Sequence, residues 1–279
     1  MFDKRREFSQ QPFPEQIDRV DPPSLGWLSL YRWQDTVVRG TAKEVALRYS
    51  RYKYGDSLEI SRFSEELRVL IEGSSVGDGI KKNPEKWVVF TPPYSSVEPA
   101  VRVVGNTIAK AFNIPHVNFR TEPVGDRKIQ YAAMTDFATR MQAKFLAQTA
   151  IDDAVAVEGK KALVMDDMVT TGVTATYMNK VLYEKYHLGY VAGFCLIDLV
   201  TNDPSTEEFI NRFLIVSGDV ESLITILSDQ NTVLNRHTVK SLYGEDKYVL
   251  DAIVPRLLPS VIEKLEQARD KYYFGKGVV

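Results

Sequence analysis

The sequence of 279 residues contains one cysteine, Cys195. A single cysteine excludes an intramolecular disulfide and a zinc site built from cysteines. Cys195 lies in the apolar run 191–200, so we expect it to be a buried strand residue and not a nucleophile.

The chain also lacks a strong excess of charge and a long apolar run. Its formal net charge of −2 and pI near 6.0 give no overall positive field for nucleic acid, so DNA or RNA binding is not expected beyond a local patch. No segment reaches about 18 uninterrupted apolar residues, and no apolar stretch follows the basic residues 4–6. These absences predict a cytoplasmic globular protein that does not bind membranes.

The most informative stretch is residues 163–175, with the sequence LVMDDMVTTGVTA. The apolar run 161–165 is typical of a buried parallel strand, and Asp166 and Asp167 stand at its end. Hydroxyl residues and a glycine follow, and then a helical pattern that places apolar residues from Ala175 to Tyr186 on one face. The stretch therefore predicts a strand, a loop and a helix.

This order of residues suits a sugar phosphate. A loop that opens a helix offers backbone N–H groups and the positive end of the helix dipole to a phosphate. The hydroxyls of Thr170, Thr171 and Thr174 add donors, and Gly172, followed by Val173, lets the backbone come close. Carboxylates suit a vicinal diol or Mg²⁺, so phosphate, diol and metal together indicate a ribose 5-phosphate substituted at its anomeric carbon.

Other interpretations of the stretch are weaker. The aspartates could cap a helix, with the threonines as turn residues. A P-loop ATPase would need a preceding Gly-x-x-x-x-Gly-Lys-Ser/Thr sequence, which the chain lacks. A haloacid-dehalogenase phosphatase would need Asp-x-Asp, whereas these aspartates are adjacent.

The pattern Asp-Asp, two residues, Thr-Thr-Gly, one residue, Thr resembles the phosphoribosyl pyrophosphate (PRPP) signature of the type I phosphoribosyltransferases. The resemblance implies that Asp166 and Asp167 hold the ribose hydroxyls and contribute to a Mg²⁺ site, through those hydroxyls or through water. It also implies that residues 170–174 surround the 5-phosphate. PRPP and Mg²⁺ are thus the expected substrate and cofactor.

A second strand, at residues 87–90, runs into a turn at residues 91–96, and a helix is expected over 97–112. In the family this turn is the pyrophosphate loop, which implies that Pro93, Tyr94, Ser95 and Ser96 contact pyrophosphate. A simple proline turn is the alternative.

A third strand is expected at 114–119, followed by a charged loop at 120–131 and a helix over 131–149. Family members carry a flexible loop here that closes over PRPP, which places Arg127 and Lys128 on the pyrophosphate as catalytic residues beside Asp166 and Asp167. A solvated cluster of charges is an equal alternative.

Over residues 47–198 the order of features resembles the ComF group of phosphoribosyltransferases. The shared features are the Tyr-Lys-Tyr-Gly segment at 52–55, Gly105-Asn106, Asn113-Ile114-Pro115, and Lys128-Ile129-Gln130 with Arg140 downstream. ComF proteins usually begin with a four-cysteine zinc module, which this chain cannot have.

We therefore expect an α/β protein with a parallel-sheet, Rossmann-like phosphoribosyltransferase core at 41–218. An N-terminal arm at 1–40, polar and rich in proline up to residue 26, precedes the core. A helical extension at 219–279, divided near Pro255 and Pro259, follows it and forms a hood or a dimerisation surface. Further elements expected are a strand or short helix at 27–38, strands at 47–56, 191–199 and 213–216, and a helix at 57–72.

The expected activity is transfer of the phosphoribosyl group from Mg-PRPP to a nitrogen nucleophile, such as a nucleobase, with release of pyrophosphate. The alternatives are a regulator that senses PRPP without turnover and a ComF-like protein associated with DNA uptake. The expected partners are PRPP and a small-molecule acceptor, and a homodimer is one use for the arm or the extension.

Overall fold

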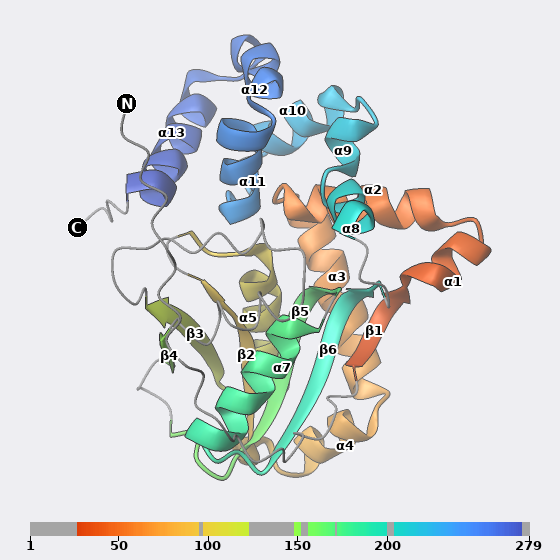
Figure 1. The fold of residues 1–279 in the computed structure, drawn as a ribbon, viewed down its shortest axis with the longest axis vertical. Helices are drawn as coiled ribbons and strands as arrows, with labels where there is room; N and C mark the ends of the chain where they lie inside the picture. The colour runs from red at the N-terminus through yellow and green to blue at the C-terminus, as the bar shows by residue number, and fades with distance from the viewer. Residues whose placement is uncertain are drawn as a thin grey trace, which may run out of the picture.

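The computed structural model describes residues 27–94, 97–122, 148–151, 156–170, 172–199 and 204–274. A sheet with helices on both faces forms the lower part of the molecule in Figure 1, and a group of helices covers its upper end. The elements in chain order are β1 (Trp27–Arg32), α1 (Trp33–Val38), α2 (Ala42–Lys53), α3 (Ser57–Glu72), α4 (Ser75–Lys82), η1 (Pro84–Lys86), β2 (Trp87–Tyr94), α5 (Ala100–Phe112), β3 (His116–Glu122), β4 (Gln148–Ile151), β5 (Lys161–Val169), α7 (Val173–Lys180), η3 (Val181–Lys185), β6 (Tyr190–Asp198), α8 (Pro204–Asn211), α9 (Phe213–Val216), α10 (Val220–Ser228), α11 (Arg236–Lys240), η4 (Ser241–Glu245), α12 (Lys247–Ile253), η5 (Val254–Arg256) and α13 (Pro259–Phe274).

The sheet has the strand order β1-β6-β5-β2-β3-β4. Every neighbouring pair is parallel except β3 and β4, which are antiparallel. The predicted parallel-sheet α/β core is therefore confirmed. Within residues 1–40, assigned to an arm from sequence, β1 belongs to this sheet because it pairs with β6 from Trp27↔Gly193 to Arg32↔Asp198; residues 1–26 lie outside the described part of the chain.

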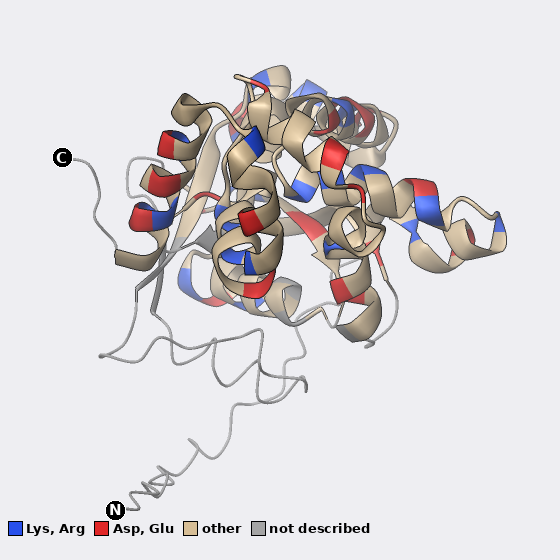
Figure 2. Ribbon diagram, turned by 90° about the horizontal axis from the view of Figure 1, so that it is seen from above, with Lys and Arg blue, Asp and Glu red and all other residues tan. Residues whose placement is uncertain are grey.

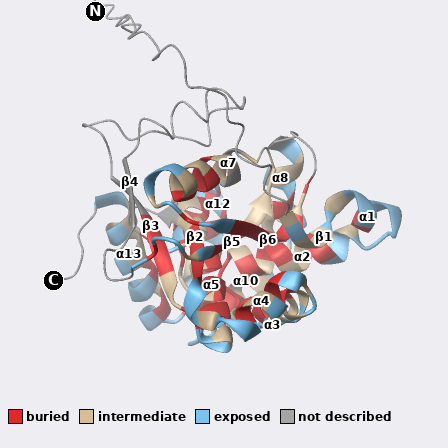
Figure 3. Cartoon of the chain, turned by 90° about the horizontal axis from the view of Figure 1, so that it is seen from below, coloured by how far each residue is buried: buried red, intermediate tan, exposed pale blue. Residues whose placement is uncertain are grey.

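Both faces of the sheet are covered, because alternate residues of its strands point to opposite sides. Val89, Leu163 and Met165 belong to the same buried cluster as residues of α3 and α5. Val88 and Val164, one position along, belong to the cluster that contains residues of α7 and η3. Figure 3 shows α7 on one side of the row of strands and α3, α4 and α5 on the other.

Helix α3 confirms the helix predicted at 57–72, because its local signals agree with its packing. The Asp56 side chain caps it by accepting a hydrogen bond from the Leu58 N–H at 2.9 Å. Phe63 and Leu67, one helical turn apart, are both buried against the sheet.

The strand predicted at 47–56 is wrong, because these residues form the end of α2 and the turn after it. Val45, Ala46, Tyr49 and Tyr52 are buried, which is the spacing of a helix face. In this segment the tyrosines lie on the buried face of a helix, and the Arg and Lys residues lie towards its exposed face. The alternation of Tyr with Arg and Lys therefore does not mark the two faces of a strand.

Three other predictions of secondary structure need correction. Residues 213–216 form the short helix α9 and not a fifth strand, since an apolar run of four residues fits either state. The helix predicted at 131–149 has its last two residues in β4; residues 123–147 are outside the described part. The turn predicted at 91–96 begins later, because Thr91–Tyr94 still belong to β2.

The prolines of β2 fit the strand for a local reason. Its ladder with β5 ends at Phe90↔Val164, while pairing with β3 continues, with a register shift, to Tyr94↔Arg120. Pro92 and Pro93 therefore come after β2 has left β5, at a place where the missing N–H groups break no ladder on that side.

The helices α10–α13, here called the cap, have a core of their own. Leu223, Leu242, Ile253 and Leu265 are buried together with Leu214 of α9, and this confirms that the C-terminal part is helical. The predicted division near the prolines is also confirmed, because Pro255 lies in η5 and α13 begins at Pro259. Within the described ranges, no helix combines the length and the apolar character that crossing a membrane requires.

The cap joins the sheet domain through the residues that end α2. Tyr54 belongs to the cap core, and its hydroxyl lies 2.7 Å from Ser241 Oγ. The next residue, Gly55, has φ +87, and a Cβ placed there would lie 2.1 Å from the Val233 carbonyl oxygen. The Val233 N–H donates to the Gly55 carbonyl at 3.0 Å. Glycine is required at this position for both its backbone angle and the close approach of two chain segments.

We predict that Gly55→Ala lowers the free energy of unfolding by at least about 2 kcal/mol, because the new methyl group adds a steric clash to the strain of a left-handed backbone. Urea unfolding measures the change.

Gly40→Ala is the matched control, since Gly40 has φ +73 and none of the described residues has an atom within 4 Å of where its Cβ would stand. It should cost only the backbone strain, about 1 kcal/mol. Equal losses for the two variants would contradict the packing role of Gly55.

Candidate functional site

Asp166 and Asp167 lie near the carboxyl end of β5, in the middle of the sheet. Residues 162–166 of this strand are buried and residues 167–169 are half-buried, so the chain reaches the surface at the acidic pair. Asp166 is 9% exposed, and one of its carboxylate oxygens accepts the Asp167 N–H at 2.8 Å. Since side chains alternate along a strand, Asp166 belongs to the α7 side of the sheet and Asp167 to the α2 side.

The acidic pair lies where the direction of the sheet connections reverses. The chain passes from β2 through α5 to β3 in one direction, and from β5 through α7 to β6 in the other. In open parallel sheets, ligands bind in the crevice beyond the carboxyl ends of the strands at this reversal. The β2–β5 ladder ends at Phe90↔Val164, whereas the β5–β6 ladder continues to Val169↔Asp198, so the strands part next to the pair.

The loop after β5 leads directly into α7. Gly172 is the residue before the helix and has φ +70, and no atom of the described residues lies within 4 Å of where a Cβ would stand. Among the described residues, no side chain packs against Gly172 at this position. The first turn of α7 contains no acidic residue. No carboxylate of this turn therefore neutralises the positive end of the helix dipole.

The structure brings most of the predicted phosphate-binding residues to this place. Thr170 and Thr174 are half-buried on either side of Gly172, and Val173 is the first residue of α7. Thr171 lies outside the described residues, as do the catalytic candidates Arg127 and Lys128, whose assignment stays a prediction.

The predicted pyrophosphate loop starts at the same edge. Pro93 and Tyr94 are the last residues of β2 and not part of a turn, while Ser95 and Ser96 are outside the described residues. Helix α5 begins at Ala100 without a side-chain cap and without an acidic residue in its first turn. Its start is a second helix N-terminus at this edge of the sheet.

Lys53 is a site residue that the sequence did not indicate. Its ammonium lies 2.7 Å from Asp167 Oδ2, and the two side chains are 18% and 16% exposed. The pair joins residues 114 positions apart, and the segment around Lys53 was predicted to be a strand. A basic residue in the last turn of a helix is a common pattern, so no local signal identified its partner.

Two buried tyrosines lie on the same helix near the pair. Tyr49 and Tyr52 are both 0% exposed, and their hydroxyls have no hydrogen-bond partner among the described residues. Burial raises the pKa of both phenols, and the negative charge of Asp167 raises each pKa further. Both tyrosines are therefore neutral at physiological pH.

The cap reaches the site at the start of α11. Asn235 Nδ2 donates to the Lys53 carbonyl at 3.0 Å, and its Oδ1 caps α11 through the N–H groups of His237 and Thr238. Burial, and next to it the charge of Lys53, holds the pKa of His237 well below its ordinary value, so this imidazole is neutral. Figure 2 looks down on the cap and shows both basic and acidic residues on its helices.

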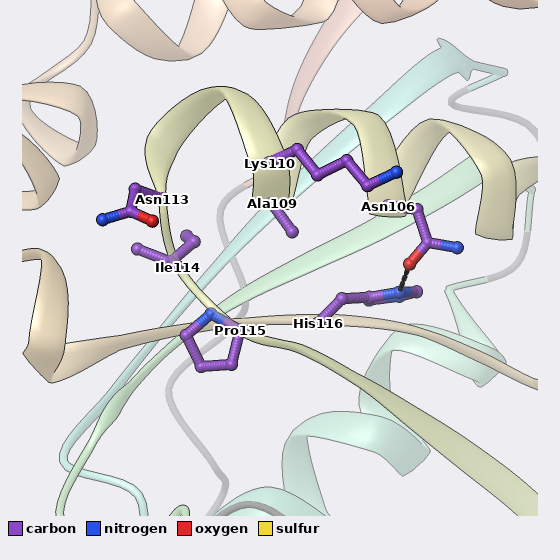
Figure 4. Close-up of a pocket in the computed structure, with 7 residues that line it drawn as sticks. All are labelled: Asn106, Ala109, Lys110, Asn113, Ile114, Pro115 and His116. Carbon is purple, nitrogen blue, oxygen red and sulfur yellow. Dashed lines mark hydrogen bonds between the residues drawn. The ribbon is translucent and has the colours of Figure 1, made fainter.

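A separate hollow of about 490 Å³ lies at the amino end of β3 and is lined by residues of α5 and by His116 (Figure 4). His116 Nδ1 lies 2.6 Å from Asn106 Oδ1, and Nε2 lies 3.1 Å from Thr91 Oγ1. A Cβ on Gly105 would stand 2.5 Å from Thr91. One ring nitrogen thus contacts α5 and the other contacts β2, so His116 holds the helix against the sheet.

Cys195 pairs with Asp166 in the ladder of β5 and β6. It is fully buried, as predicted, and burial, followed by the charge of Asp166, raises its thiol pKa well above the ordinary value. The thiol therefore stays protonated and inert.

The acidic pair fits a metal ion that binds together with a substrate. Among the residues that the structure describes, no group of three or more His, Cys, Asp and Glu could hold a metal ion. Mg²⁺ often uses only one or two carboxylates, with water and substrate phosphates completing its shell. Two adjacent carboxylates, one of them paired with Lys53, suit this second type of site.

No family model and no curated protein sequence matches the chain. Solved structures that resemble it include the adenine phosphoribosyltransferase of Saccharomyces cerevisiae, with 14% identity, 56% of this chain and 73% of that chain covered, and a TM-score of 0.33. The adenine phosphoribosyltransferase of Rhodothermus marinus matches with 22% identity, 49% and 69% coverage and a TM-score of 0.30. A hypoxanthine phosphoribosyltransferase of Staphylococcus aureus matches with 13% identity, 50% and 62% coverage and a TM-score of 0.31.

Proposed function

We propose that this protein is a phosphoribosyltransferase that transfers the 5-phosphoribosyl group of Mg-PRPP to a ring nitrogen of a nucleobase and releases pyrophosphate. The observation that carries the proposal is the position of the signature residues. Asp166 and Asp167 lie near the carboxyl end of a central strand at the reversal of the sheet connections, and the glycine-containing loop after this strand leads into a helix.

Each part of this edge suits one part of PRPP. The N-terminus of α7, with Thr170, Gly172 and Thr174, would bind the 5-phosphate. The carboxylates would accept hydrogen bonds from the ribose hydroxyls. The end of β2 and the start of α5 lie at the same edge of the sheet, where the pyrophosphate would lie.

The reaction needs no protein nucleophile. The bond between the anomeric carbon and the pyrophosphate oxygen breaks, its electron pair leaves with pyrophosphate, and a lone pair of the acceptor nitrogen forms the new bond to carbon. The acceptor's proton goes to solvent. The protein's residues hold the ribose and the phosphates so that the acceptor and the leaving group are in line. Bound Mg²⁺ would supply positive charge to the departing pyrophosphate.

The cap is proposed to form the acceptor side of the site. It covers the carboxyl end of the strands in Figure 1 and reaches Lys53 through Asn235. Acceptor selection would then depend on the start of α11, next to the neutral His237.

The test of the activity is release of pyrophosphate from Mg-PRPP in the presence of each of a panel of nucleobases. We expect release with at least one base, at a rate that depends on the concentration of both substrates. PRPP binding measured by calorimetry, without pyrophosphate release from any base, would instead identify a PRPP-sensing regulator.

We predict that Asp166→Asn and Asp167→Asn each weaken the binding of ribose 5-phosphate by about tenfold, because an amide is a weaker acceptor for the ribose hydroxyls than a carboxylate. Calorimetric titration measures the affinity. Asp198→Asn is the control, since Asp198 ends the neighbouring strand β6 at the same edge but lies outside the signature. Unchanged affinity in both signature variants would show that the diol binds elsewhere.

We predict that Gly172→Val abolishes measurable binding of ribose 5-phosphate, because a branched side chain would occupy the open space beside the N-terminus of α7. Gly159→Val is the matched control. Gly159, in the turn before β5, has φ +71, and in the part of the chain that the structure describes no atom lies within 4 Å of where its Cβ would stand. Both variants should lose similar stability in urea unfolding, whereas only Gly172→Val should lose the ligand. Equal affinities would place the 5-phosphate away from this loop.

A further inference from the structure

Lys53 forms an ion pair with Asp167, so the ammonium of a protein side chain is a counter-ion for the acidic pair. Lys53 Nζ lies 2.7 Å from Asp167 Oδ2, and less than a fifth of each side chain is exposed. The ammonium also lies 5.7 Å from the centre of the Tyr49 ring. A pair that is largely removed from water interacts more strongly than one on the open surface.

The cap contacts the backbone of Lys53, whereas Asp167 contacts its side chain. The Asn235 side chain binds its carbonyl at 3.0 Å, and the next two residues contact Ser241 and Val233. Lys53 is the last residue of α2, so both its helix and the cap restrict where the ammonium can move. Its position over Asp167 is therefore built into the fold.

This arrangement changes what the acidic pair attracts. Two adjacent carboxylates without a counter-ion would carry a charge of about −2, which attracts divalent cations and repels phosphates. With the Lys53 ammonium in contact, the local charge is about −1. Free metal is then bound less strongly, and a polyanionic sugar phosphate is repelled less.

We propose that Lys53 is a positioning residue that neutralises Asp167, so that the acidic pair binds the diol of a ribose phosphate in preference to a free metal ion. This inference rests on the proposed function, since it assumes that the ligand is a sugar phosphate. Under this proposal Asp167 binds the ribose hydroxyls, and the metal ion enters the site bound to the phosphates of the substrate.

The first arm of the test measures metal binding without any sugar phosphate. Mn²⁺ is titrated into the wild type and Lys53→Met, and free Mn²⁺ is followed by electron paramagnetic resonance. Lys53→Met should bind Mn²⁺ about tenfold more tightly, because removal of the ammonium leaves both carboxylates uncompensated. Lys53→Arg, which keeps the charge, should bind Mn²⁺ as weakly as the wild type.

The second arm measures ribose 5-phosphate binding in the presence of EDTA. Lys53→Met should bind the sugar phosphate about tenfold more weakly than the wild type, and saturating Mg²⁺ should reduce this difference to less than about threefold. Misfolding would weaken both ligands, whereas the proposal requires one affinity to rise while the other falls. Lys53→Gln is a second neutral variant for the case in which Lys53→Met does not fold.

Lys161→Met is the matched control for both arms. Lys161 begins the same strand β5 at its other end, where its ammonium lies 5.4 Å from the centre of the Trp87 ring. Neither affinity should change in this variant. Unchanged Mn²⁺ affinity in Lys53→Met, or unchanged sugar phosphate affinity in EDTA, would overturn the proposal. If the wild type itself does not bind ribose 5-phosphate, the proposed function fails, and the Mn²⁺ arm alone decides whether Lys53 neutralises Asp167.

Discussion

The end of α2 is the contact on which the rest of the arrangement depends. Three consecutive residues there bind two parts of the molecule: Lys53 contacts Asp167 of the sheet, Tyr54 contacts Ser241 of the cap, and Gly55 contacts the chain before α11. A second buried link strengthens this junction, because Asp246 of the cap is 0% exposed and is paired with Arg212 between α8 and α9. A buried carboxylate is tolerated only with such a partner, so the cap has a defined position over the strands.

The sequence predicted the elements whose local signals and packing agree. The strands at 87–90 and 191–199 and the helix at 57–72 were correct because their apolar residues repeat with one clear period and are bounded by turn or cap residues. Where the period was short or mixed, the predictions failed. Tyr49, Tyr52 and Tyr54 alternate with basic residues in a way that fits a strand, and only burial of Val45 and Ala46 on the same side shows the helix. Four apolar residues at 213–216 were too few to separate a strand from a short helix.

The candidate site was predictable only where its residues are neighbours in the chain. Asp166 and Gly172 belong to one strand–loop–helix unit, so spacing alone indicated their chemistry. Lys53 reaches the same site from 114 positions away, and such a contact follows from the packing of α2 on the sheet and not from any local pattern. Pro93 and Tyr94 were assigned to a turn because prolines usually interrupt strands, yet β2 continues past them by leaving the ladder with β5.

The junction also links the ligand to the stability of the cap. Lys53 contacts Asp167 with its side chain and Asn235 with its carbonyl group, so any movement of the helix end changes both contacts. A ligand that binds only when Asp167 is correctly placed favours the conformations in which this helix end is formed. Because Tyr54 and Gly55 follow without a break, the same conformations are those in which the cap is docked. The free energy of binding of the proposed ligand at the acidic pair would therefore add to the free energy that holds the cap over the strands.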